Sequence, residues 1–448
     1  MSLQKSRLAK NSLWMILSRF GAQGLTVIFT ILLARRLGIE GFGAYTFIAA
    51  IIFVANALTT FGTDMLLIRE IAAKGDLSRL PSALIVQLVL SILFIAAVWM
   101  FGAWTPNQTS EIVTALKIYC FALIPLAFFT IFTTALRGIQ RLDIYSLLNL
   151  IVSVLQVGVV LLPNFDIIRL SALLLAVQII AAVFAGFVCI MTIPDFWQVW
   201  KFPSVHLFSL LKQAAPIAWL TVLGMIYQRL SIYMLSTMSG ATETGIYSAA
   251  SRAVEASKTM HLAVFAALYP AMAEGTSLPH DLLSNSHQVQ VLQGKRSPMQ
   301  SPNRLGDYFT PTRFAMTYFG FLFVGATIIS LLLFIFAKPL IMMLFDNEFI
   351  ASSNVLQILA WMLIPFTVNT YLTLSFLASK RESIVGRALM ASLLGLLILN
   401  LWWIPAKGPE GGAWAALIAE CIQSTMLLAS AGSQVNVQGD GHEFSELS

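Results

Sequence analysis

Apolar runs of membrane-spanning length recur along almost the whole chain, separated by short polar breaks. A helix that crosses the hydrocarbon core of about 30 Å needs about 20 apolar residues. We place such helices at residues 12–34, 43–62, 80–103, 114–136, 145–162, 169–193, 208–236, 243–272, 315–338, 355–378, 384–405 and 411–433. The runs are about twice as long as a membrane β-strand and do not alternate apolar with polar residues. The sequence therefore predicts an all-α membrane protein with about twelve transmembrane helices.

The composition agrees with this class. Charged residues make up 11% of the chain and hydrophobic residues 58%, whereas about 25% of the residues in a soluble domain are charged. The first apolar run, 13–33, is too long for the core of a signal peptide, so we expect it to be the first membrane helix. The three cysteines lie inside apolar runs without the spacing of a metal site or a disulfide framework. We therefore expect no metal or other cofactor.

The distribution of lysine and arginine predicts the orientation in the membrane. Most of the 27 fall within loops on the same side as the N-terminus. The opposite loops hold Arg35, Arg36, Arg169, Lys338 and Lys407. Positive residues favour the cytoplasmic side, so both termini are predicted to be cytoplasmic. The net charge of +6 follows from this bias, and we expect no nucleic-acid partner.

A short pattern occurs twice, after the first and after the seventh predicted helix. Residues 38–45 and 240–247 both have the form G-x-x-x-x-G-x-Y. A repeat at this position divides the chain into two halves of six helices. Because six is even, the halves have the same orientation and are related by an axis along the membrane normal.

This division gives the predicted domains: an N-terminal six-helix lobe at 1–193, a linker at 194–207 and a C-terminal six-helix lobe at 208–433. The two pseudo-symmetric lobes are expected to surround a central cavity. The polar stretch 273–314 is predicted to be a cytoplasmic loop, and the tail 434–448 is predicted to be disordered. Helix kinks or breaks are expected at Pro125, Pro216, Pro270 and Pro365.

Charged residues within the predicted spans are candidates for the transport path, because each costs at least about 2.5–3.5 kcal/mol to insert. The candidate substrate-path cations are Arg19, Arg229, Arg252 and Lys258. Lys117 and Arg19 lie near helix ends, where extension of the side chain to the membrane surface is the competing explanation. The excess of basic residues favours an anionic substrate, since arginine binds phosphate oxygens well.

The acidic candidates for ion coupling or charge balancing are Glu255, Asp64 and Glu420. Glu255 lies three residues from both Arg252 and Lys258 on one predicted helix, so it can pair with either. Neutralisation of one of these cations and coupling to protons both remain open for Glu255. Glu420 has no partner that the sequence identifies.

Several short motifs carry a resemblance to a known family. They occur in order at Leu8–Trp14, Ala34–Tyr45, Leu67–Ala72, Gln213–Pro216, Gly245–Ala250 and Leu268–Pro270. Together they resemble the bacterial polysaccharide (O-antigen type) flippases of the multidrug/oligosaccharidyl-lipid/polysaccharide exporter superfamily. The last five predicted helices match in hydropathy and number only, and the polar 273–314 loop is not typical of the family.

The resemblance implies a two-lobed transporter in the bacterial cytoplasmic (inner) membrane. Its expected cargo is an undecaprenyl-pyrophosphate-linked oligosaccharide for O-antigen, capsule or exopolysaccharide synthesis. The driving force is expected to be an ion gradient, and the sequence shows no Walker A pattern. Expected partners are this polyprenyl-pyrophosphate-linked oligosaccharide, membrane lipid, and the polysaccharide polymerase and chain-length machinery.

Two other functions remain open. A multidrug or cation antiporter of the same superfamily is disfavoured by the basic interior. A lipid-linked glycan polymerase or ligase is disfavoured because every predicted outer loop is short, so we do not expect an enzyme. No motif identifies the sugar composition, the coupling ion and its stoichiometry, the oligomeric state or the role of the 273–314 loop.

Overall fold

The computed structural model describes residues 2–163, 166–194, 196–201, 207–274, 313–379 and 381–443. Side chains of residues 2–20, 103, 201, 260, 263–274, 313–318, 378 and 432–443 lie outside this description. The described residues form helices and short turns, with no strand among them. The first half contains α1 (Ser2–Thr60), α2 (Thr63–Lys74), α3 (Leu80–Phe101), η1 (Gly102–Trp104), α4 (Ser110–Tyr119), η2 (Cys120–Ala122), α5 (Leu123–Gly138), α6 (Leu142–Val160), α7 (Ile167–Thr192) and α8 (Phe196–Lys201). The second half contains α9 (Leu207–Ser239), α10 (Ala241–Glu274), α12 (Arg313–Ile335), α13 (Ala337–Phe345), η4 (Asn347–Phe349), α14 (Ser352–Ala360), α15 (Leu363–Ala378) and α16 (Glu382–Glu443).

Within the described part of the chain, seven helices are long and apolar enough to cross a membrane, or up to nine if each bent pair counts as one span. Two of the seven are each divided by a glycine. Gly38 divides α1 with a φ of 67°, and Gly408 divides α16 with a φ of 55°. Both angles lie in the left-handed region, which glycine adopts without a Cβ clash. The all-α membrane class is confirmed, and the number of twelve spans stays a prediction.

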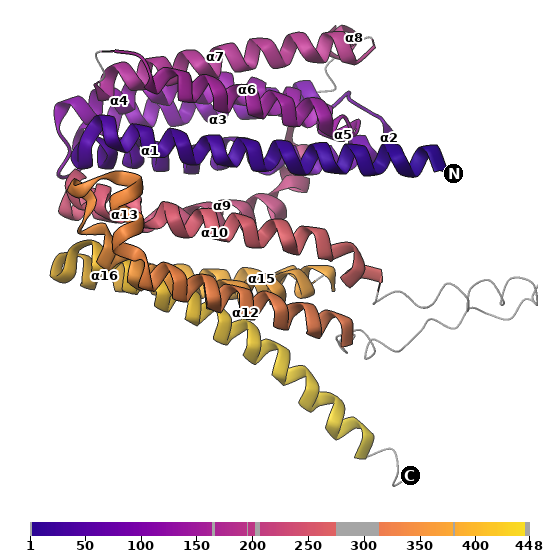
Figure 1. Ribbon diagram of the computed structural model, residues 1–448. Helices are drawn as coiled ribbons and strands as arrows, with labels where there is room; N and C mark the ends of the chain where they lie inside the picture. The colour runs from indigo at the N-terminus through magenta and orange to yellow at the C-terminus, as the bar shows by residue number, and fades with distance from the viewer. Residues whose placement is uncertain are drawn as a thin grey trace, which may run out of the picture.

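The helices gather in two groups that run along a common direction (Figure 1). One group contains α1 to α7, and the other contains α9 to α16. The groups meet at the end of the bundle opposite the N-terminus, here called the distal end, where α13 lies beside α1. There the ring of Phe42 packs edge-on against the ring of Phe349, with 6.0 Å between their centroids. Phe42 and Phe349 are both fully buried, so this contact joins the groups through a dry apolar core.

The two copies of the G-x-x-x-x-G-x-Y pattern touch each other at the distal end. A methyl group on Gly43 would overlap the carbonyl oxygen of Ala241. In the reciprocal contact, a methyl group on Gly245 would overlap the carbonyl oxygen of Ile39. The glycines therefore allow the α1 and α10 backbones to approach more closely than any other residue would permit.

A hydrogen bond continues this contact one turn further along both helices. The hydroxyl of Ser248 donates to the Thr46 hydroxyl oxygen over 3.0 Å, and the two residues are 202 positions apart. Thr46 and Ser248 are equivalent residues of the repeat and are both buried. The sequence repeat is thus a pair of surfaces that pack against each other, which the sequence alone does not predict.

The linker and the 273–314 loop are only partly described, and the C-terminal tail is helical over part of its length. The predicted linker 194–207 contains the short helix α8, and linker residues 195 and 202–206 are not described. Of the predicted 273–314 loop, residues 275–312 are not described. The tail predicted to be disordered from 434 is helical as far as Glu443.

Candidate functional site

A cavity of about 900 Å³ lies between the two groups of helices and is lined by residues of α1, α9, α10, α14, α15 and α16. Its charged lining residues, among those described, are Arg229, Glu255, Arg252, Lys258 and Glu420. All five of these charged residues belong to α9, α10 and α16. The charges of the cavity wall, among the described residues, therefore come from the second half of the chain.

The first charged cluster joins α9 to α10. The guanidinium of Arg229 donates from Nη1 to Oε1 of Glu255 over 2.9 Å. The guanidinium of Arg252 donates from Nη1 to Oε2 of the same carboxylate, also over 2.9 Å. Each carboxylate oxygen of Glu255 thus accepts a hydrogen bond from a different arginine. One negative charge lies between two positive charges.

The second charged cluster joins α10, α15 and α16. The ammonium of Lys258 donates to Oε1 of Glu420 over 3.3 Å and lies 4.6 Å from the centroid of the Phe366 ring. The amide of Asn369 donates to Oε2 of Glu420 over 2.7 Å. Ser424 in turn donates to the side-chain oxygen of Asn369 over 2.8 Å. Both carboxylate oxygens of Glu420 are occupied, as a buried charge requires.

The described residues of the cavity leave one positive charge in excess, because three cations face two carboxylates. The α1 wall is uncharged among the described residues and presents Gln23, Thr26 and Phe53. The ring of Phe53 lies 4.7 Å from the Arg229 guanidinium carbon, so a cation–π contact connects the two halves across the cavity. This arrangement suits an anion on the α9–α10 wall and polar groups on the α1 wall.

The structure brings together most, but not all, of the predicted residues. Arg229, Arg252 and Lys258 line one cavity, whereas Asp64 lies in the first turn of α2 and is not among its lining residues. Arg19 belongs to α1, but its side chain lies outside the described residues. Lys117 stands over the ring of Trp99, 5.4 Å from its centroid, and does not line the cavity.

Of the two partners that the sequence leaves open for Glu255, the structure shows Arg252. Lys258 pairs instead with Glu420, while the two arginines bond to the two carboxylate oxygens of Glu255. Sequence reasoning missed Asn369, the second partner of Glu420. The sequence gives one indication of Asn369, which is its polar side chain within the apolar run 355–378.

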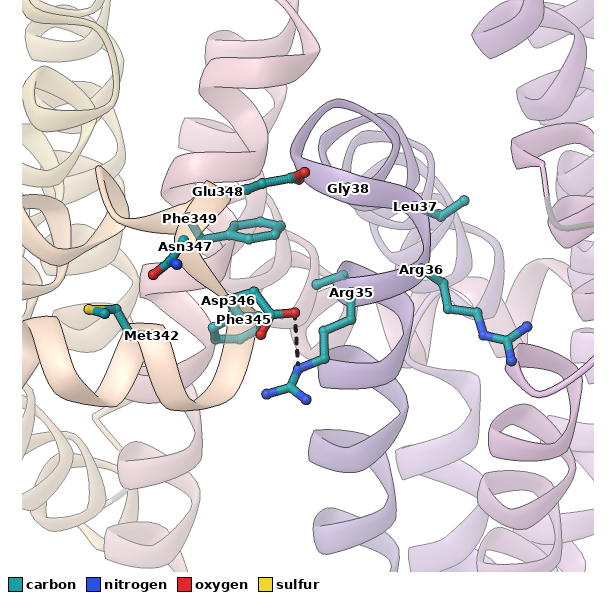
Figure 2. Close-up of a pocket in the computed structure, with 11 residues that line it drawn as sticks. Arg35, Arg36, Leu37, Gly38, Met342, Phe345, Asp346, Asn347, Glu348 and Phe349 are labelled. Atoms are coloured by element: carbon teal, nitrogen blue, oxygen red, sulfur yellow. Dashed lines mark ion pairs between the residues drawn. The ribbon is translucent and has the colours of Figure 1, made fainter.

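A second pocket, of about 610 Å³, lies at the distal end between the Gly38 turn and the segment that follows α13 (Figure 2). The Arg35 side chain extends from α1 toward this segment and lies 3.7 Å from a carboxylate oxygen of Asp346. Arg35 also donates from Nε to the carbonyl of Leu344 over 2.9 Å. A cation at the C-terminal end of a helix such as α13 is favourable, so Arg35 holds the two halves together here.

Comparison with known proteins gives a family and a fold. The sequence model of a family described as "Polysaccharide biosynthesis protein" matches residues 8–276. No curated protein sequence matches the chain.

Solved structures that are similar include the lipid II flippase MurJ in an inward closed conformation, with a TM-score of 0.67 and 15% identity over 94% of this chain and 87% of that one. An inward-facing multidrug resistance transporter of the MATE family, from the MOP superfamily, has a TM-score of 0.65 and 13% identity over 92% and 96% of the two chains. A MOP superfamily transporter from Pyrococcus furiosus has a TM-score of 0.58 and 12% identity over 95% of each chain. At these identities the likeness establishes a shared fold.

Proposed function

The chain belongs to the family of polysaccharide biosynthesis proteins, and from this premise we propose that it is a flippase for a lipid-linked oligosaccharide. Its cargo is an undecaprenyl-pyrophosphate-linked unit, carried from the cytoplasmic to the outer leaflet of the bacterial inner membrane. The product serves a surface polysaccharide such as O-antigen, capsule or exopolysaccharide. The observation that carries the proposal is the cavity between the halves, whose described charges sum to a positive value.

The chemistry of the cavity supports an anionic headgroup. Pyrophosphate must lose part of its hydration when it leaves the membrane surface, and buried arginines compensate its charge with strong hydrogen bonds. Arg229 and Arg252 lie on neighbouring helices and meet at one carboxylate, so they are close enough to bind one phosphate group together. A transporter of organic cations would instead need uncompensated carboxylates in the cavity.

The energy source in this proposal is an ion gradient, and the lobes rock to expose the cavity to either side in turn. The contacts of Glu420 support charge balancing, because Lys258 and Asn369 occupy both of its oxygens. Arg19 remains a proposed cation of the path. Asp64 remains a proposed coupling residue, although it does not line the cavity among the described residues.

Deletion of the gene tests the proposal. We expect the loss of one surface polysaccharide, together with accumulation of its lipid-linked units on the cytoplasmic side, because units that are not flipped cannot reach the outer face. The measurement is glycan analysis of the cell surface and of extracted lipid-linked sugars. Unchanged glycans combined with increased sensitivity to cationic drugs would instead identify a multidrug antiporter.

A further inference from the structure

Glu255 is the most exposed member of the cluster that it forms with Arg229 and Arg252. Its side chain is 37% exposed, whereas those of Arg229 and Arg252 are 14% and 24% exposed. The carboxylate is thus the most accessible member of the cluster, and it lies in the wall of the cavity. Its two oxygens each accept from a different guanidinium, as two oxygens of one phosphate group do when two arginines bind it.

The carboxylate of Glu420 provides the contrast within the same cavity. Its side chain is 5% exposed, and Asn369 and Lys258 hold both oxygens in place. Both carboxylates line the cavity, but Glu420 is almost fully buried among its partners, whereas Glu255 is more open to the cavity. The two carboxylates have the same charge but different freedom to move.

Arg252 also retains a hydrogen-bond donor that Glu255 does not use. Its Nε–H is buried and has no acceptor among the described residues, while its Nη1 bonds to the carboxylate. A buried donor without a partner is uncommon in folded proteins. The cluster therefore has more donor capacity than one carboxylate satisfies, and a phosphate group offers three acceptor oxygens instead of two.

We propose that Glu255 is an internal stand-in for the substrate's phosphate, which holds Arg229 and Arg252 in place while the cavity is empty and is displaced when the pyrophosphate enters. This inference rests on the proposed function and adds a rule of specificity to it. An entering group must replace a carboxylate of charge −1, so a second monoanion gains little. Pyrophosphate carries more negative charge and more acceptor oxygens than the Glu255 carboxylate. It therefore displaces this carboxylate from the two arginines.

The test uses the full-length protein purified in detergent, with Glu255→Gln as the variant and the thermal unfolding midpoint as the readout. The probes are inorganic pyrophosphate and acetate, compared with sodium chloride at equal ionic strength. A ligand that binds the folded state raises the midpoint. For the wild-type protein we expect stabilisation by pyrophosphate and none by acetate, because Glu255 excludes the monoanion.

For Glu255→Gln we expect a lower midpoint without anions, since two arginines then lack their counter-charge. Both probes should restore it, acetate by replacing the missing carboxylate. The pyrophosphate concentration for half-maximal stabilisation should fall by about tenfold, within the usual range of coupling between two competing groups. Glu420→Gln is the matched control, and acetate should not restore its stability because that carboxylate is enclosed.

Two results would overturn the inference. One is a Glu255→Gln protein that unfolds early and gains nothing from either anion, which would make the cluster a structural ion pair. The other is an acetate response that survives when Arg229→Gln is added to Glu255→Gln. Neither result depends on the glycan phenotype of the gene deletion. An anion response with intact surface glycans would instead reject the proposed function and leave the binding site standing.

Discussion

Alanine at Arg229 or at Arg252 is expected to abolish export of the surface polysaccharide while the amount of protein in the membrane stays normal. Either single change removes one phosphate-binding guanidinium but leaves Glu255 with the other as its partner. The carboxylate thus keeps a counter-charge, and folding is preserved. Loss of one partner from a buried pair of charges costs about 2–5 kcal/mol of binding, enough to weaken substrate binding by about 30-fold or more.

The measurement is the surface glycan of a deletion strain that carries each variant, with membrane protein quantified by immunoblot. Arg141→Ala is a suitable control, because Arg141 forms an exposed ion pair with Asp143 outside the cavity and such pairs contribute little. Lysine at position 229 or 252 tests whether charge alone suffices, since lysine lacks the planar fork of arginine. Full export by both alanine variants would contradict a cationic substrate path.

The second large effect is expected from Gly43→Ala and Gly245→Ala. Each added methyl group would overlap a backbone carbonyl of the other half of the protein, and backbone cannot rotate away as a side chain can. Overpacking of this kind typically costs about 1–3 kcal/mol. We expect a lower thermal unfolding midpoint for each variant and a weaker export phenotype than for the arginine variants, with the largest stability loss in the double variant.

Gly158→Ala is the matched control for these substitutions. Gly158 lies within α6 with nothing within 4 Å of the position that a Cβ would occupy. Alanine there should be neutral or should stabilise α6 by about 0.5–1 kcal/mol. If Gly43→Ala unfolds at the same temperature as Gly158→Ala, the close approach of α1 and α10 does not contribute to stability.

The sequence predicts the elements better than the contacts between them. Apolar run length is a property of each segment alone, so the predicted spans fall largely within helical segments of the structure, although their ends differ. The prolines predict some of the helix breaks and not others. Pro125 and Pro365 lie in the first turns of α5 and α15, where new helices begin, whereas Pro216 lies inside the uninterrupted α9.

The site shows the same division between local and distant information. The Arg252–Glu255 pair is predictable because two residues three positions apart on one helix lie side by side. Glu420 lies 162 residues from Lys258, and only the packing of α10 against α16 brings them together. Charge and hydropathy thus identify which residues need a partner in lipid, while the three-dimensional structure decides which partner each one obtains.

The reciprocal contact between the two glycine patterns has a consequence for the origin of the chain. A surface on which residue i meets j and residue j meets i is isologous, the type that joins two identical subunits about a twofold axis. Ile39 with Gly245 and Gly43 with Ala241 satisfy this rule, and the bond between Thr46 and Ser248 joins two equivalent positions. The contact between the two repeat copies thus has the geometry of a homodimer interface, formed here within one polypeptide.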